Sequence, residues 1–260
     1  MITSLTNPQV KEAVKLRERK KRREDELIII DGRREIQRAI ASGIEIKKIF
    51  FDPKGCNESL TAVMYSSGAE MIDVAPNVLE KIAYGSRDEG AVAIAKHPVR
   101  TLDDLKLSKS PLIGIAEGVE KPGNIGALLR SADGAGLDAL ILADCKTDLY
   151  NPNAIRASLG TIFSVPVVET TSDEAIRWLE QNGIAIFAAI VDGAVEYATV
   201  NYKQPCAIVV GAEDDGLTDR WRGKNVTPIF LPMNGIADSL NVSVTAGILY
   251  YHALSQRKAR

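Results

Sequence analysis

The chain has 260 residues, of which 45% are hydrophobic and 25% are charged, and its formal net charge is −2. This composition is typical of a folded protein of one or two domains and argues against a uniformly basic nucleic-acid binder. Its apolar runs fall short of the ~20 residues that a membrane span needs, and the first residues lack a signal-peptide pattern. The expected location is therefore the cytoplasm.

The cysteines and histidines are few and scattered. Cys56, Cys145 and Cys206 lie far apart in the sequence, and the histidines are His97 and His252. Structural zinc sites and disulfide frameworks need closely spaced or paired ligands, so we expect neither a metal site nor a disulfide.

Basic residues concentrate near the N-terminus, in a cluster that we call the basic cluster: Arg17, Arg19, Lys20, Lys21, Arg22 and Arg23. Such a cluster can contact the phosphates of a nucleic acid. It can also be the solvated end of a helix, since three acidic residues follow it directly. The residues alone leave both interpretations open.

Residues 1–97 alternate between strand and helix patterns. Asn7 and Pro8 are typical of a helix start. Apolar runs predict strands at 27–30, 46–51, 71–74 and 91–95, and helices are expected around 33–41, 58–66 and 78–83. This alternation predicts a small α/β sandwich domain at 1–97, followed by a linker at 98–110 with prolines near its ends.

Residues 111–260 have a different pattern of short apolar runs that are nearly continuous. Such runs are typical of strands buried on both faces of a parallel sheet. Strands are expected at 112–116, 139–143, 184–190, 207–210 and 228–231, and helices at 125–135, 153–159, 173–181 and after Asn241. We expect a doubly wound α/β domain without the G-x-G-x-x-G or P-loop motif of common nucleotide-binding proteins.

Three loops that follow predicted strands carry candidate functional residues. In an open α/β sheet, ligands bind outside the carboxyl ends of the strands. The loops are 117–126, which leads to Asn124 and Arg130, then 211–216 with Glu213, and 231–241 with Met233, Ser239 and Asn241. Taken singly, each has a plain structural explanation as a turn, a helix cap or a surface ion pair.

Together these loops resemble the three motifs of the SpoU/TrmH family of SPOUT RNA methyltransferases. They read N-I-G-x-L-x-R, V-V-G-A-E-x-x-G-L and L-P-M-x-G-x-x-x-S-L-N-V-S-V, and residues 151–160 resemble the family's N-P-x-x-x-R-x-S-x-G segment. The resemblance covers about residues 111–258. The N-terminal unit resembles the RNA-binding substrate domain that often precedes this fold. One departure is Glu120-Lys121-Pro122-Gly123, where many relatives carry Asp-Pro, and it concerns substrate detail.

The resemblance implies methyl transfer from S-adenosylmethionine to a ribose 2′-hydroxyl of structured RNA, without a metal. It also implies a homodimer formed through the methyltransferase domain and a deep trefoil knot, with the C-terminal segment threaded through the loop after Gly211. The implied cofactor-binding residues are Gly211, Ala212, Gly216, Leu231, Met233, Ser239 and Leu240. The implied catalytic residues are Asn124, Arg130, Glu213, Ser239 and Asn241. Arg156 is a candidate phosphate contact beside the basic cluster.

Arg130 would activate the 2′-hydroxyl either directly or through the adjacent phosphate. We favour the second role, because an arginine normally stays protonated. The extra N-terminal domain favours ribosomal RNA over tRNA, and a tRNA 2′-O-methyltransferase is the alternative. A base methyltransferase and a non-enzymatic RNA-binding or assembly protein are less favoured, because the third motif and the candidate catalytic residues are intact.

Overall fold

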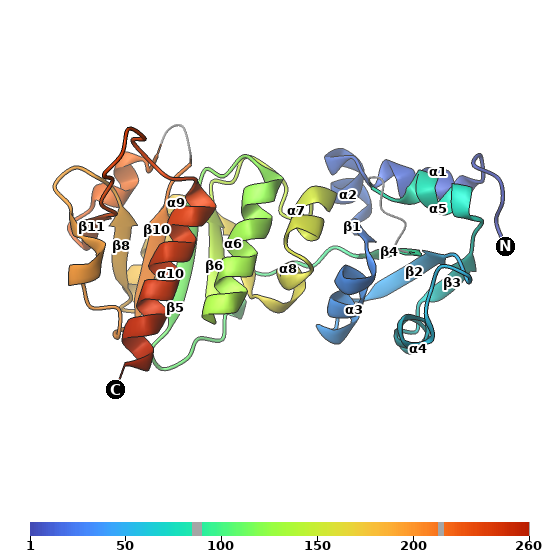
Figure 1. Ribbon diagram of the computed structural model, residues 1–260, viewed down its shortest axis with the longest axis horizontal. Coiled ribbons are helices and arrows are strands. Elements are labelled where there is room, and N and C mark those ends of the chain that lie inside the picture. Colours follow the sequence, from blue (N-terminus) through green and yellow to red (C-terminus); the bar gives the residue numbers. More distant parts are fainter. Residues whose placement is uncertain (85–89, 213–215, 260) are drawn as a thin grey trace. The chain divides into compact units, whose positions relative to one another are not determined.

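The computed structural model describes residues 1–84, 90–212 and 216–259, and its contacts divide the chain into two units (Figure 1). Unit 1 comprises Met1–Val99 and Asp148–Ser164, and unit 2 comprises Arg100–Thr147 and Val165–Arg260. The chain therefore passes between the units three times. The expected linker at 98–110 begins close to the first passage. The segment Asp148–Ser164, which the sequence pattern assigned to the C-terminal domain, packs instead with unit 1.

Unit 1 is built on a four-stranded sheet in the order β1-β4-β2-β3. The β1–β4 and β4–β2 pairs are antiparallel, and β2–β3 is parallel. The strands are β1 (Leu27–Asp31), β2 (Ile46–Phe51), β3 (Glu70–Asp73) and β4 (Ala91–Lys96). The helices are α1 (Pro8–Lys15), α2 (Arg19–Asp25), α3 (Arg33–Ala41), α4 (Glu58–Ser66), α5 (Pro76–Ile82), α7 (Pro152–Ala157) and α8 (Thr161–Ser164).

Helices cover both faces of this sheet, which confirms the small α/β unit expected at the N-terminus. Helices α1 and α5 contact each other and enclose a core with Ile29, Phe50 and Val92 of the sheet. Helix α3 packs on β1 and β4 and against α4. From the later segment, α7 contacts β1 and α8 contacts α3.

Unit 2 contains a seven-stranded sheet in the order β7-β6-β5-β10-β8-β11-β9, in which the neighbours pair in parallel. The strands are β5 (Leu112–Glu117), β6 (Ala139–Ala143), β7 (Val167–Thr170), β8 (Ala185–Ala189), β9 (Val195–Glu196), β10 (Cys206–Val210) and β11 (Val226–Phe230). The helices are α6 (Pro122–Ala135), α9 (Ser172–Gln181) and α10 (Val242–Lys258), with short 3-10 turns η1 (Leu102–Asp104), η2 (Tyr197–Thr199) and η3 (Asp219–Arg222).

The parallel α/β architecture expected for the C-terminal part is confirmed. Helices α6 and α10 pack side by side over one face of the sheet (Figure 1). Helix α9 covers the other face, where Trp178 and Trp221 join the apolar residues of the central strands. Alternating residues of β5, β6 and β10 are thus buried on both faces of the sheet, which explains their continuous apolar runs. Among the described residues, no helix is long and apolar enough to cross a membrane.

Candidate active site

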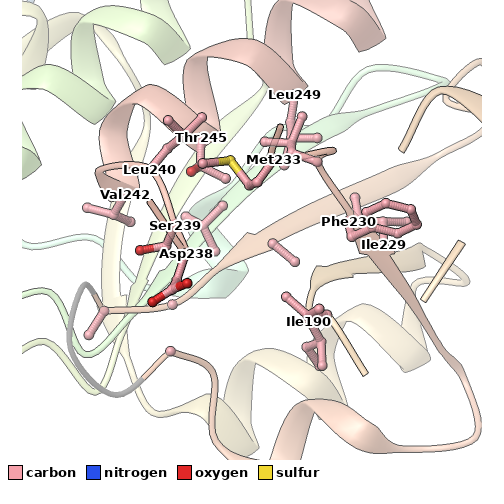
Figure 2. A pocket seen from close by; sticks show the side chains of 17 residues that line it. Ile190, Ile229, Phe230, Met233, Asp238, Ser239, Leu240, Val242, Thr245 and Leu249 are labelled. Carbon is pink, nitrogen blue, oxygen red and sulfur yellow. The ribbon is translucent and has the colours of Figure 1, made fainter. Parts of the chain in front are cut away.

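A cavity of about 450 Å³ lies at the carboxyl edge of the unit 2 sheet. Three neighbouring strands, β10, β8 and β11, end at it, and the start of α10 with the segment before it closes the opposite side (Figure 2). The residues that line it are Ala189, Ile190, Val191, Val210, Gly211, Ala212, Gly216, Ile229, Phe230, Leu231, Met233, Asp238, Ser239, Leu240, Val242, Thr245 and Leu249. The lining is mainly apolar, with a few polar side chains, as in sites for small organic ligands.

The chain reaches the cavity from β11 and leaves it through α10. Pro232 lies two residues after Phe230, the last residue of the strand, and prevents its ladder from continuing. The segment 232–241 is exposed and ends at Asn241, whose Oδ1 accepts from the backbone N–H of Ser243 at 3.0 Å and caps α10. In Figure 2 the oxygen atoms of Asp238 and Ser239 lie toward one end of the cavity and Phe230 toward the other.

Gly211 occupies a position that admits no side chain. A Cβ atom there would lie 2.2 Å from the carbonyl carbon of Gly216 and 2.5 Å from the nitrogen of Leu217. The two arms of the turn are also joined by a hydrogen bond from Gly216 N to Ala212 O at 3.1 Å. The backbone of Gly216 and Leu217 thus fills the space that a side chain at Gly211 would need. As lining residues without side chains, Gly211 and Gly216 offer the cavity only backbone, which a ligand can approach closely.

The seven residues that the sequence proposed for cofactor binding all line this one cavity. They are Gly211, Ala212, Gly216, Leu231, Met233, Ser239 and Leu240. They come from two loops that are separated in the sequence but meet because β10 and β11 flank the same strand, β8. Their role in binding S-adenosylmethionine stays a prediction.

The predicted catalytic residues are brought together only in part. Asn241 Nδ2 donates to Asn124 Oδ1 at 3.3 Å, which joins the start of α10 to the first turn of α6. Ser239 precedes Asn241 by two residues and lines the cavity. Glu213 lies outside the described residues.

Arg130 stands apart from this group. It lies on α6, six residues after Asn124, so it is about 9 Å further along the helix axis and roughly 120° around it. Its side chain is exposed, and it is not among the residues that line the cavity. The guanidinium is thus available to a partner that approaches from outside.

Sequence reasoning missed the contributions of Asp238 and Thr245 to the cavity, and those of Ala189 at the end of β8 and of Val191 just after it. Thr245 lies one helical turn after Asn241, so the helix period could have indicated it. The end of β8 is an ordinary apolar run, and nothing local distinguishes it from a buried strand.

Comparison with known proteins decides the family. A model of the SpoU rRNA Methylase family matches residues 111–251, more than half of the chain. The chain belongs to the SpoU rRNA methylase family. A model of the MRM3-like substrate binding domain matches residues 7–93 of this SpoU methylase. Both findings confirm the resemblance expected from the motifs.

Several relatives of this SpoU methylase match it over nearly its whole length. A 23S rRNA (uridine(2479)-2′-O)-methyltransferase of Streptomyces viridochromogenes is 30% identical over 252 residues, which cover 92% of this chain and 85% of the relative. A solved RNA 2′-O ribose methyltransferase is 40% identical, with 98% of each chain covered and a TM-score of 0.84. An AdoMet-bound rRNA methyltransferase from Sinorhizobium meliloti is 29% identical, with 97% of this chain and 96% of that chain covered and a TM-score of 0.89.

The basic cluster of this SpoU methylase is not one surface, and the assignment of Arg22 to RNA binding is wrong. Arg22 is only 1% exposed. Its guanidinium forms a buried ion pair with Asp148, with Nε 2.9 Å from Oδ2, and also donates to the carbonyl oxygens of Leu16 and Arg17. A side chain so enclosed cannot reach a phosphate.

Arg17 has a structural role as well. Its guanidinium donates to the last carbonyl groups of α5, at Lys81 and Ile82 (2.7 and 3.0 Å), and to that of Ala83. It therefore satisfies carbonyls that a helix end leaves without intrahelical partners. Arg17 is half-buried, so only part of its side chain faces solvent.

The remaining predicted RNA-binding residues keep their charges near the surface. Arg19, Lys20 and Arg23 on α2 are exposed, and Lys21 pairs with Asp25 at 2.7 Å. Arg156 lies in unit 1 and pairs at 3.5 Å with Asp31, whose carboxylate is buried. Their contacts with RNA stay predictions.

Proposed function

We propose that this chain transfers a methyl group from S-adenosylmethionine to a ribose 2′-hydroxyl of ribosomal RNA in the cytoplasm. The observation that carries the proposal is that two of the three family motifs line one cavity, and that Asn241 joins it to the remaining motif at Asn124. Two relatives that match over most of the chain are named 23S rRNA 2′-O-methyltransferases, and a solved relative is named an AdoMet-bound rRNA methyltransferase.

The residues present fit the cofactor. The cavity volume of about 450 Å³ lies in the range of small-molecule sites. Apolar side chains such as Ile190 and Leu249 suit an aromatic base, while Asp238, Ser239 and Thr245 can bind polar groups. The bare backbone at Gly211 lets a ligand pack directly against the chain. When bound, S-adenosylmethionine supplies a methyl group already activated by its sulfonium.

The protein then has to align the ribose and stabilise the charge that develops on its 2′-oxygen. Asn124 and Asn241, which are hydrogen-bonded to each other, form the polar border between the cavity and α6. Ser239 adds a hydroxyl to the same border. Arg130, exposed on α6, binds the phosphate beside the target ribose and so places and polarises the nucleotide. Glu213 remains part of the proposed catalytic set.

The homodimer and the trefoil knot expected from the family are further parts of this proposal. Helix α10 supports the dimer because it is apolar on two sides. Val242, Ala246, Leu249, Tyr250 and Ala253 are buried in unit 2, whereas Val244, Ile248 and Tyr251 are 48%, 38% and 52% exposed. A helix with two apolar faces is normally covered on both. A second copy of the same unit provides the missing cover.

The test is methyl transfer to unmodified rRNA transcripts with isotopically labelled S-adenosylmethionine. Mass spectrometry of the nuclease-digested product should place the label on a ribose, and the modified position should resist alkaline cleavage. A transcript with 2′-deoxyribose at that position should accept no label, because the acceptor hydroxyl is absent. Labelling of a base, or of the deoxyribose transcript, would contradict the ribose assignment. Labelling of tRNA transcripts alone would select the tRNA alternative.

A further inference from the structure

A buried carboxylate joins three loops at the same edge of the sheet as the cavity. Glu117, the last residue of β5, is 3% exposed. Its Oε1 accepts from Ser172 Oγ at 2.7 Å and from Thr218 Oγ1 at 2.8 Å, and its Oε2 accepts from Thr218 N at 2.8 Å. A buried carboxylate is costly unless such donors satisfy it, so these bonds hold their partners firmly.

Thr218 leads directly back to the cavity wall. It follows Gly216, a lining residue, by two positions. The backbone of Gly216 and Leu217 lies against Gly211 so closely that a Cβ atom does not fit between them. Any displacement of Thr218 is therefore transmitted to Gly211 on the opposite arm of the turn, because no space is left to absorb it.

Glu117 also lies beside the other arm of this turn. Its strand pairs in parallel with β10, with Ala116 opposite Val210, the residue before Gly211. The carboxylate of Glu117 thus fixes Thr218, which follows the turn, relative to β10, which precedes it. Glu117 itself does not line the cavity.

We propose that Glu117 is a positioning residue of the cofactor site, which acts through Thr218 to hold Gly211 and Gly216 at the spacing the cofactor needs. The inference rests on the proposed function, since it takes the cavity to be the site of S-adenosylmethionine. Ser172 ties the same carboxylate to the start of α9, which does not line the cavity.

The experiment compares the Kd of S-adenosylmethionine, measured by calorimetric titration, for Thr218→Val, Thr218→Ser and Ser172→Ala in the full-length protein. Thr218→Val removes the hydroxyl but keeps the side-chain shape. Because Thr218 is exposed, we expect the variant to fold. We expect its Kd to rise about tenfold, the size of one hydrogen bond to a charged group. Thr218→Ser keeps the hydroxyl and should bind within about twofold of the wild type.

Ser172→Ala is the matched control, because it removes a similar hydrogen bond between the same carboxylate and a helix that does not line the cavity. It should lower the melting temperature without changing the Kd. A second variant, Glu117→Leu, should raise the Kd more than Thr218→Val does. The stoichiometry of the titration gives the fraction of this variant that is folded, and the Kd refers to that fraction. In turnover assays Thr218→Val should raise KM for S-adenosylmethionine and leave kcat unchanged.

The outcomes separate the inference from the function on which it rests. Wild-type protein that fails to bind S-adenosylmethionine would overturn the proposed function. Wild-type binding with an unchanged Kd for Thr218→Val would overturn the positioning role of Glu117 alone. Equal weakening by Thr218→Val and Ser172→Ala would also overturn it, since that pattern indicates general destabilisation.

Discussion

Arg130 and the cavity are parts of the proposed site that substitution can separate. Arg130 is exposed on α6 and does not line the cavity, so its loss should not disturb the bound cofactor. Arg130→Ala should therefore reduce kcat on rRNA by about 100-fold or more, as expected when a donor to developing charge is removed. The Kd of S-adenosylmethionine should stay within about twofold of the wild type. Arg130→Lys should recover only part of the activity, since lysine lacks the guanidinium fork.

Substitution of Gly211 should have the opposite effect to that of Arg130, because it should weaken cofactor binding while the protein still folds. In Gly211→Ala the new methyl group would clash with the backbone of Gly216. Gly216 would then have to shift, and it is part of the cavity wall. S-adenosylmethionine binding should weaken at least about tenfold, since a well-packed wall cannot absorb the added volume. Gly223→Ala is the control, because its Cβ atom would meet nothing closer than 4.0 Å. Equal Kd values for the two variants would show that this wall does not contact the cofactor.

At the scale of residues, the sequence singled out residues that line one cavity but did not indicate which neighbouring charges are exposed. Arg22 and Arg23 are adjacent, yet one is buried and the other exposed, because the helix turns them by about 100° relative to each other. The partner that burial requires is Asp148, 126 positions away. Glu117 likewise gave no signal, since its donors come from two other loops. Both sets of contacts join residues that are far apart in the sequence, and a local sequence pattern does not predict such contacts.

Among the elements, α10 is held at its C-terminal end by side-chain hydrogen bonds of Arg257 and Gln256. The guanidinium of Arg257 donates to the carbonyl oxygens of Ser110, Pro111, Tyr202 and Gln204, at the amino edge of the sheet. It also lies 3.5 Å from the thiol of Cys206, whose pKa burial raises, so that the thiol stays protonated beside the cation.

Arg257→Ala should lower the free energy of unfolding by about 2–3 kcal/mol, because several carbonyl groups lose a charged donor. Urea unfolding followed by circular dichroism measures this change. Lys258→Ala, at the exposed next position, should change it by less than about 0.5 kcal/mol. Similar losses for both variants would indicate that the helix end frays and that Arg257 does not fasten it.

Helix α2 buries Arg22 and exposes the basic residues Arg19, Lys20 and Arg23. Reversing Arg19, Lys20 and Arg23 to glutamate should weaken rRNA binding and flatten its dependence on salt, because fewer counterions are released. A filter-binding or fluorescence titration at several salt concentrations measures both effects. Reversing the exposed Lys106, Lys109 and Lys224 of unit 2 changes the net charge equally and should have a smaller effect. Equal effects would restore the interpretation of α2 as a merely solvated helix.

Most elements could be predicted from the sequence, and the omissions have physical causes. The pattern gave β6 its observed bounds, because a continuous apolar run between polar segments is unambiguous. It missed β7 (Val167–Thr170), where the apolar pattern ends after two residues, and β9 (Val195–Glu196), which is exposed and two residues long. Both lie at sheet edges, where one side of the strand faces no neighbour and the composition is less constrained.

At the scale of the whole molecule, the expected dimer can be tested through the exposed side of α10. Ile248 lies between Val244 and Tyr251 on that side. Ile248→Glu should convert the dimer to a monomer in sedimentation experiments, because the charge would be desolvated in the interface. Tyr65→Glu, which alters an exposed aromatic residue of unit 1, should leave the dimer intact. A wild-type protein that sediments as a monomer would remove the dimer from the proposal.

Unit 1 is completed by Asp148–Ser164, which the chain supplies only after it has begun unit 2. During synthesis, Arg22 therefore lacks its buried partner Asp148 until the ribosome has added more than a hundred further residues. Unit 1 therefore cannot complete its folding from residues 1–99 alone as they leave the ribosome. For the same reason, grafting only residues 1–99 onto another enzyme would transfer an arginine without its carboxylate. Recombination that preserves this unit has to carry the later segment with it.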